Sequence, residues 1–167
     1  MLAWGNSDYG QLGLGGTTHF ATPRVVEDLG AAGVVRLAAG GWHSAAVTAS
    51  GGVFVWGRGE YGRLGLGDNW KDRLRPTELH VAAPVAEVAC GGSHSLVITA
   101  GRQLMSFGRP AFGRLGRSGG SNPNVPNPVE FPPPPEGRRW ACESVSAGGR
   151  HTLALVRAVP LAGAAPS

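Results

Sequence analysis

The chain has 167 residues, of which 42% are apolar, with 15 lysine and arginine residues against 11 aspartate and glutamate residues. No stretch approaches the roughly 18 apolar residues of a membrane-spanning helix, and Met1–Gly5 lack the basic and apolar regions of a secretory signal. We therefore expect an intracellular protein, in the cytoplasm or the nucleus, that does not contact a membrane.

Three copies of one pattern run through the chain at nearly constant spacing. Trp4 and Trp56 are 52 residues apart, and Trp56 and Phe107 are 51 residues apart. Self-similarity at such a period is typical of stacked or radially repeated units. Each copy has an aromatic–glycine pair, a Gly-x-Leu-Gly turn and a Gly-Gly-x-His segment. We expect these repeated positions to be structural: Trp4, Gly5, Gly10, Leu12, Gly13, Gly40, Gly41, His43; Trp56, Gly57, Gly62, Leu64, Gly65, Gly91, Gly92, His94; Phe107, Gly108, Gly113, Leu115, Gly116, Gly148, Gly149 and His151.

Short strands and turns alternate within each unit. Residues 34–38 alternate apolar and polar side chains, as a half-buried strand does. A second strand is expected at 44–48 and, after a glycine-rich turn, a third at 52–56. Equivalent strands are expected at 85–89 and 95–99, and edge strands after each repeated proline at 25–26, 78–79 and 129–131. Four such strands per unit predict β-propeller blades, with units at about 2–51, 52–103 and 104–156.

The third unit departs from the other two. It contains four consecutive prolines at 132–135, within an expanded region at 131–140 that we expect to form a long surface loop. A docking segment for a proline-recognising domain is the alternative. After this unit, residues 157–167 are small and mostly apolar, and we expect a disordered tail.

The composite repeat resembles that of the regulator of chromosome condensation family. The resemblance covers roughly residues 2–156 and rests on Trp-Gly, the Gly-[Gln/Arg]-Leu-Gly turn and Gly-Gly-x-His-[Ser/Thr]. Details such as 55–64 look most like plant members. The kelch propeller is the rival, but its Gly-Gly pair is followed by spaced Tyr and Trp rather than by His. The resemblance implies an all-β fold, here three repeat units of an incomplete, normally seven-bladed propeller.

The net charge of +4 rests almost wholly on arginine, and the arginines are scattered along the sequence. This scatter favours ordinary surface charge, which makes nucleic acid an unlikely partner. The alternative is a basic face for nucleic acid or for an acidic partner.

Nothing in the sequence predicts catalysis. A catalytic group is needed once per active site, whereas His43, His94 and His151 recur once per unit. We therefore interpret them as structural imidazoles that bond neighbouring backbone inside each blade. Cys90 and Cys142 are spaced for neither a metal site nor a disulfide framework, so no catalytic residue, cofactor or metal is expected.

The loop-rich faces of a propeller suit an interaction platform. We expect a non-catalytic protein-interaction module with an unidentified protein partner, and candidate binding residues Trp42, Arg58, Glu60 and Arg63. Guanine-nucleotide exchange on a small GTPase is the alternative that the resemblance implies. A third is an ultraviolet-B receptor, which the residues disfavour. The tryptophans of that receptor precede the repeated His by two residues, where this chain has Gly41, Gly92 and Gly149.

The two ends of the repeat array are expected to carry unpaired strands. The first strand, around Trp4-Gly5, has no preceding hairpin partner, and the last, 152–156, has no following one. Open edges and apolar end faces promote association between chains. We therefore expect self-association, in which two copies would supply six blades, within the closing range of propellers.

Overall fold

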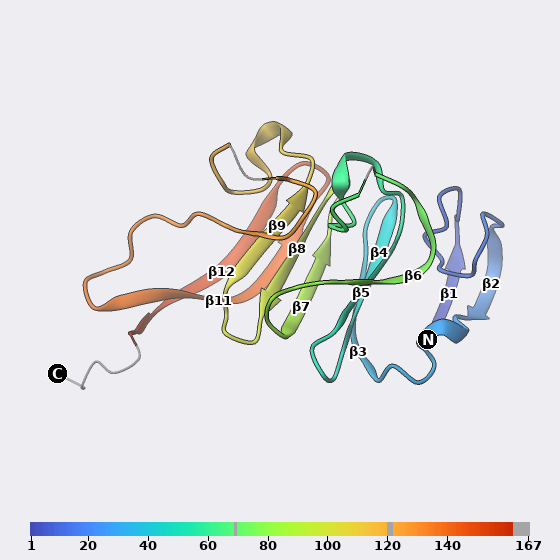
Figure 1. The fold of residues 1–167 in the computed structure, drawn as a ribbon, viewed down its shortest axis with the longest axis horizontal. Coiled ribbons are helices and arrows are strands. Elements are labelled where there is room, and N and C mark those ends of the chain that lie inside the picture. Colours follow the sequence, from blue (N-terminus) through green and yellow to red (C-terminus); the bar gives the residue numbers. More distant parts are fainter. Residues whose placement is uncertain (69, 120–121, 162–167) are drawn as a thin grey trace.

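The computed structural model describes residues 1–68, 70–119 and 122–161. It is built of short antiparallel strands and three single-turn 3₁₀ helices, arranged as four sheets side by side along the long axis of the molecule (Figure 1). The elements in chain order are β1 (Leu2–Gly5), β2 (Phe20–Val25), η1 (Glu27–Leu29), β3 (Val34–Ala39), β4 (His43–Thr48), β5 (Val53–Gly57), η2 (Glu60–Gly62), β6 (Arg73–Leu79), β7 (Val85–Cys90), β8 (His94–Thr99), β9 (Leu104–Gly108), η3 (Ala111–Gly113), β10 (Asn127–Pro128), β11 (Arg138–Ala147) and β12 (Thr152–Pro160).

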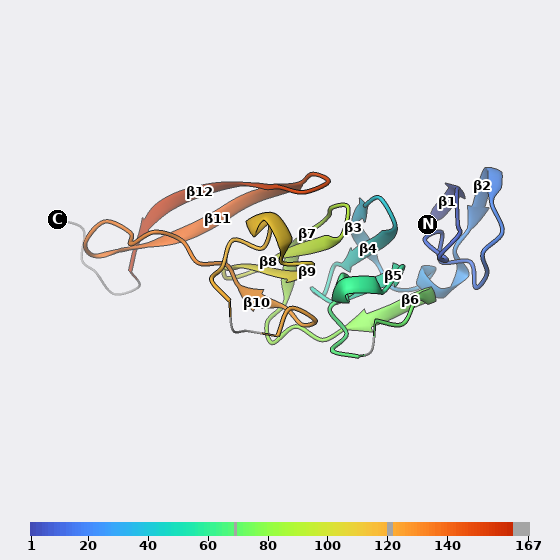
Figure 2. The same cartoon turned by 90° about the horizontal axis from the view of Figure 1, so that it is seen from above.

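The two central sheets are complete four-stranded blades. One has the order β3-β4-β5-β6 and the other β7-β8-β9-β10. The end sheets, β1-β2 and β11-β12, have two strands each, and Figure 2 shows them at opposite ends of the row. No helix in the described part of the chain is long and apolar enough to cross a membrane.

The sequence units do not coincide with the blades. The boundary after residue 51 falls in the turn between β4 and β5, and the boundary after residue 103 falls between β8 and β9. Both pairs of strands belong to one sheet. The second sequence repeat therefore supplies the last two strands of one blade, β5 and β6, and the first two strands of the next, β7 and β8, so it links neighbouring blades covalently.

The predicted edge strands are present with different bounds. Pro23, Pro76 and Pro128 lie inside β2, β6 and β10, each of which pairs with a single neighbour. A proline costs no ladder bond where its nitrogen faces away from the neighbouring strand. The predicted edge strand at 129–131 is wrong, because β10 ends at Pro128 and only the Val129 amide continues with a bond to the Leu104 carbonyl, at 3.0 Å.

The region after the proline run also differs from the prediction. Arg138 and Trp140 belong to β11 rather than to a surface loop, and Arg138 pairs with Pro160 at the far end of the β11-β12 hairpin. The expected tail does not begin at Arg157, because β12 extends to Pro160. Ladder hydrogen bonds to β11 hold these residues in the sheet. Residues 162–167 lie outside the described part of the chain.

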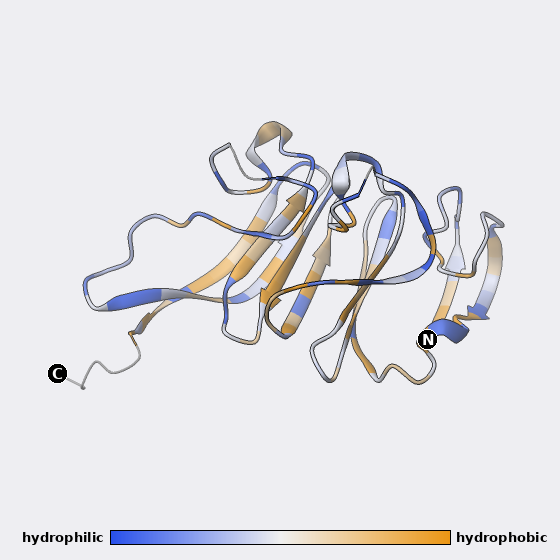
Figure 3. Ribbon diagram, in the orientation of Figure 1, coloured by the Kyte–Doolittle hydropathy of each residue, from blue (hydrophilic) through white to orange (hydrophobic). Residues whose placement is uncertain are grey.

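The core lies between neighbouring sheets. Phe107 is fully buried beside Val55 and Leu64, and Figure 3 shows the hydrophobic colour on strands of both the central and the end sheets. The repeated turn glycine packs against the ring of the next unit. A Cβ on Gly65, where φ is +72°, would lie 2.7 Å from the Phe107 ring. Both the positive φ and the close ring therefore favour glycine at this position.

Candidate functional site

A chain of buried hydrogen bonds joins the two central blades. The Nε2 atom of His43 lies 2.7 Å from the Ser95 hydroxyl, and that hydroxyl lies 2.7 Å from the Arg63 carbonyl oxygen. The hydroxyl has one proton, which it donates to the carbonyl, so it accepts from His43 Nε2–H. His43 is therefore neutral, with its proton on Nε2. Burial, and then the positive charge of Arg63, lower the pKa of His43 from 6.5 to about 3.

The same chain recurs at the next junction. His94 Nε2 lies 2.9 Å from the Thr152 hydroxyl, which donates to the Arg114 carbonyl at 2.9 Å. The prediction that these imidazoles bond backbone inside their own blade is wrong, because each reaches a hydroxyl of the following blade. The third repeated histidine, His151, is exposed at the start of β12.

Two repeated arginines reinforce these junctions. Arg63 is 1% exposed and donates to the Glu60 and Gly92 carbonyl oxygens, both at 2.9 Å. Arg114 donates to the Ala111 carbonyl at 2.8 Å and to the Ser93 hydroxyl at 2.6 Å within its own blade, and across the junction to the Gly149 carbonyl at 3.3 Å. Burial is the main cause that lowers the pKa of Arg63 to about 10, which leaves its guanidinium charged at neutral pH.

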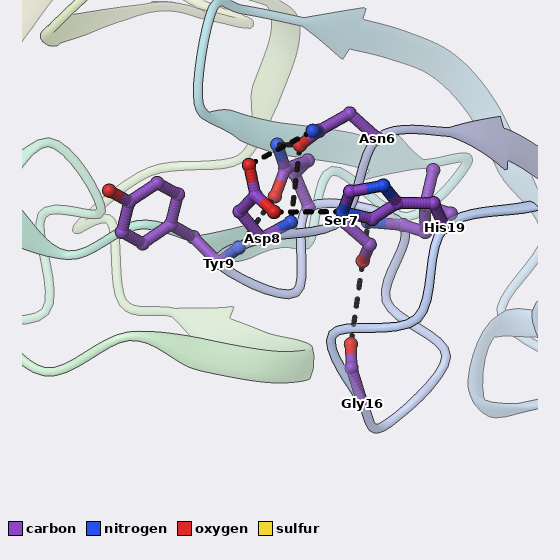
Figure 4. Close-up of polar contacts among 8 residues, drawn as sticks. Asn6, Ser7, Asp8, Tyr9, Gly16 and His19 are labelled. Carbon is purple, nitrogen blue, oxygen red and sulfur yellow. Dashed lines mark hydrogen bonds and ion pairs between the residues drawn. The ribbon is translucent and has the colours of Figure 1, made fainter.

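The first unit lacks such an arginine and closes its turn locally (Figure 4). Gln11 stands in the place of Arg63 and donates to Asn6 Oδ1 at 2.7 Å, while Asn6 donates to Asp8 at 3.0 Å. His19 is hydrogen-bonded to the same carboxylate at 2.8 Å. These bonds, led by that of Asn6, hold the pKa of the exposed Asp8 below its usual value. The turn of the first unit therefore contributes no arginine to the junction between blades.

Aromatic rings and guanidinium groups alternate on the face that carries these turns. Arg58 lies over the Tyr9 ring at 4.4 Å and near the Trp42 ring at 5.7 Å, and the two rings meet edge to face. On the next blade, Arg109 lies over the Tyr61 ring at 4.5 Å. Each of these contacts joins an aromatic residue of one blade to an arginine of the following blade, so the surface is built by the packing of adjacent blades.

In a third contact of the same kind, Arg150 lies over the Phe112 ring at 5.1 Å. Phe112 and Tyr61 both have φ of 63°, in the left-handed region that bulky residues rarely occupy. Such strained positions cluster at binding and catalytic sites. Their side chains project onto the same face as the arginines, and this strain marks the turns as candidates for function.

The four predicted binding residues, Trp42, Arg58, Glu60 and Arg63, come together around one hollow of about 350 Å³. The sequence analysis missed four further lining residues, Tyr61, Arg109, Arg114 and Arg150. The sequence does contain a signal for Arg109, because it lies 51 residues after the predicted binding residue Arg58, which is one repeat period. The repeat places residues that are distant in the sequence side by side on neighbouring blades.

The hollow carries the net charge of the whole chain. Five of the 15 cationic residues line it, with one of the 11 carboxylates, which gives a net charge of +4, and the remaining 10 cations and 10 anions balance. The scatter of these five arginines along the sequence therefore does not extend to their positions in space. They are scattered along the sequence but gathered in space, because the repeat stacks equivalent positions.

Both cysteines are free and buried. Burial raises the pKa of Cys90 to about 12 and also raises the pKa of Cys142. Such thiols are packing residues rather than nucleophiles or metal ligands. Among the described residues, no group of three His, Cys, Asp or Glu side chains is close enough to hold a metal ion.

The consecutive antiparallel four-stranded sheets define a β-propeller. A family model of the regulator of chromosome condensation (RCC1) repeat matches residues 1–47 and 50–98, and a second RCC1 repeat model matches residues 34–63 and 85–114. The chain belongs to this family.

The fold is shared with solved RCC1-type structures. Human WBSCR16 superposes with a TM-score of 0.79 at 27% identity, over 93% of this chain and 40% of that chain. Prp20p from Saccharomyces cerevisiae superposes with a TM-score of 0.82 at 20% identity, over 97% of this chain and 40% of that chain.

The curated relatives have several activities. The human E3 ubiquitin-protein ligase HERC2 is 39% identical over 134 residues, 78% of this chain and 3% of the relative. The secretion-regulating guanine nucleotide exchange factor of Mus musculus is 38% identical over 157 residues, 92% of this chain and 32% of the relative. The ultraviolet-B receptor UVR8 of Arabidopsis thaliana is 33% identical over 157 residues, 93% of this chain and 34% of the relative. The chain thus spans about a third or less of these relatives, and the similarity is not special to plant members.

Proposed function

We propose that the chain is a non-catalytic protein-interaction module whose binding site is the arginine–aromatic hollow. The observation that carries the proposal is the gathering of a net charge of +4 around Arg58, Arg109 and Arg150 on one loop-bearing face. Arginine and aromatic side chains are enriched where proteins bind one another. The two free, buried cysteines support a reducing compartment, such as the cytoplasm or the nucleus.

The buried groups of the junctions argue for structure rather than catalysis. His43 and His94 are buried and donate to hydroxyls that in turn donate to carbonyls. A general base must reach the proton of a substrate, and these imidazoles are closed off from solvent. Their role is to join blades, which gives the face above them a fixed shape.

A photo-crosslinking experiment in cells tests the proposal. Benzoylphenylalanine replaces Trp42, which is 41% exposed at the hollow, and in a matched control it replaces exposed Ala83 in the connection between β6 and β7. We expect a crosslinked product of defined mass from position 42 only. Its yield should fall when Arg109→Gln is added. Equal yields from both positions, or none from position 42, would contradict the proposal.

Guanine-nucleotide exchange on a small GTPase is a second candidate, which the similarity to the secretion-regulating exchange factor favours. The measurement is the release rate of fluorescent GDP from small GTPases in the presence of micromolar chain. The interaction proposal expects no acceleration over spontaneous release. A large acceleration that is lost on changing the 58–63 turn would make exchange the function.

A further inference from the structure

We infer that the basic hollow binds a carboxylate-rich segment of a partner protein. The inference rests on the proposed interaction function and names the chemistry of the partner. Five guanidinium groups share the hollow with one carboxylate, Glu60. Glu60 lies 2.5 Å from Arg58 and 3.6 Å from Arg63, so this single carboxylate is shared by two guanidinium groups and does not pair with Arg109 or Arg150.

Two arginines of the hollow are engaged in hydrogen bonds within the protein, and two others are available to bind a ligand. Arg63 and Arg114 are buried and donate to carbonyls at the blade junctions. Arg109 and Arg150 lie over aromatic rings, and in the described parts of the chain neither is paired with a carboxylate. A stacked guanidinium keeps its N–H groups at the ring's edge, in the geometry that a carboxylate accepts bidentately.

Mutual repulsion among these cations favours an anionic ligand. Burial, and then the charge of Arg58, lower the pKa of Arg63 to about 10. Burial, and then the charges of Arg109 and Arg150, lower the pKa of Arg114. A bound anion would relieve this repulsion as well as accept hydrogen bonds. The hollow is therefore preorganised for negative charge.

The ring contacts favour an acidic peptide over single-stranded nucleic acid. Nucleic acid of that kind is held by bases that stack on free aromatic faces. Tyr9, Tyr61 and Phe112 each already carry a guanidinium at 4.4, 4.5 and 5.1 Å respectively. On the ring face that a guanidinium covers, a base would have to displace the arginine, whereas a carboxylate binds the arginine where it lies.

Fluorescence anisotropy with the 167-residue chain tests this inference. The probes are a labelled peptide of alternating Glu and Ser, the same peptide with Gln for Glu, and a labelled oligothymidylate. We expect binding of the Glu peptide alone, with an affinity that falls as salt rises. The paired substitution Arg109→Gln and Arg150→Gln should weaken it by about tenfold or more, as expected for loss of a charge-assisted hydrogen bond.

A matched control removes the same charge elsewhere. Arg36→Gln and Arg138→Gln alter exposed arginines of β3 and β11, and we expect less than about twofold change, as for surface charges beyond the screening length. Equal loss in both double variants, equal binding of the Gln peptide, or tighter binding of oligothymidylate would overturn the inference. If position 42 crosslinks a partner while the Glu peptide fails to bind, the acidic-segment inference fails and the interaction function stands. If position 42 gives no crosslink and the Glu peptide does not bind, the proposed interaction function is contradicted as well.

Discussion

His43 of one blade donates its Nε2 proton to Ser95 of the next blade, at 2.7 Å, and Ser95 donates to the Arg63 carbonyl at 2.7 Å. Both His43 and Ser95 are about 1% exposed. One hydroxyl therefore pairs with both a buried imidazole N–H and a buried carbonyl, and it does so across the junction between blades.

Removing that hydroxyl should destabilise the protein. In Ser95→Ala the His43 N–H and the Arg63 carbonyl both lose their partner in a buried junction. We expect a loss of about 2–4 kcal/mol in the free energy of unfolding, since each unsatisfied buried group costs about 1–3 kcal/mol. Urea unfolding measures it. Ser146→Ala, at an exposed position of β11, is the control, and an equal loss there would contradict the explanation.

The buried imidazoles should make stability depend on pH. The folded-state pKa of His43 is about 3, below the ordinary 6.5, so the unfolded chain binds more protons between these values. The stabilisation is complete above about pH 6.5 and is lost progressively as the pH falls towards 3. At pH 5 the loss from His43 is about 2 kcal/mol, and His94, with its pKa lowered to about 4, acts in the same direction.

Urea midpoints at pH 7.5 and pH 5 measure this dependence. The variant His43→Gln has no titrating group at the junction and should lose less stability between the two pH values. His80→Gln, which alters an exposed histidine, should behave like the unsubstituted chain. A pH dependence that is unchanged in His43→Gln would show that other groups control acid unfolding.

The cysteine thiols should be inert in the folded protein. Cys90 is 8% exposed with its pKa raised to about 12, and Cys142 is fully buried. Because the thiolate is the reactive form, we expect an aromatic disulfide reagent at pH 8 to modify neither cysteine in buffer and both in urea. Rapid modification of either thiol in buffer would show that the junctions open readily.

The chain should associate through its end sheets. In the described part of the chain β1 pairs only with β2, and β12 only with β11. Leu153 and Leu155, on one face of β12, are 65% and 62% exposed. Apolar strands with an open edge promote association. Sedimentation should show mass rising with concentration at micromolar chain.

Charges on the open sheet should reduce that association. Leu153→Lys with Leu155→Lys is the test variant, and Leu161→Lys, beyond the end of β12, is the control. A compact monomer of the unsubstituted chain that unfolds in one cooperative transition would disprove the expectation.

Ultraviolet-B light should leave the protein unchanged despite its similarity to UVR8. Trp42 has Ser93 and Arg150 at the equivalent places in the other units, and no two tryptophan rings are in contact within the described residues. Size-exclusion chromatography and tryptophan fluorescence lifetime before and after illumination check this. Reversible dissociation driven by light would contradict it.

The sequence alone determined the fold class and much of the strand order. The period of about 51 residues identifies radially repeated units, and alternation of apolar residues locates strands such as β3 and β7. Pro76 marks an edge strand, because a proline cannot take part in a central ladder. These features depend on residues close together in the chain, and local patterns report them. No local pattern predicts that residues 157–160 pair with β11. The sequence-based assignment of that segment to a disordered tail is therefore wrong.

Only the tertiary structure decided how units meet. The partner of His43 is 52 residues away in Ser95, and the ring under Arg109 belongs to Tyr61, in the preceding turn. Such contacts depend on how one blade packs against the next, a relation that no local pattern encodes. The same packing turns arginines that are scattered along the sequence into one basic hollow, because a fixed period places equivalent side chains at the same end of adjacent sheets.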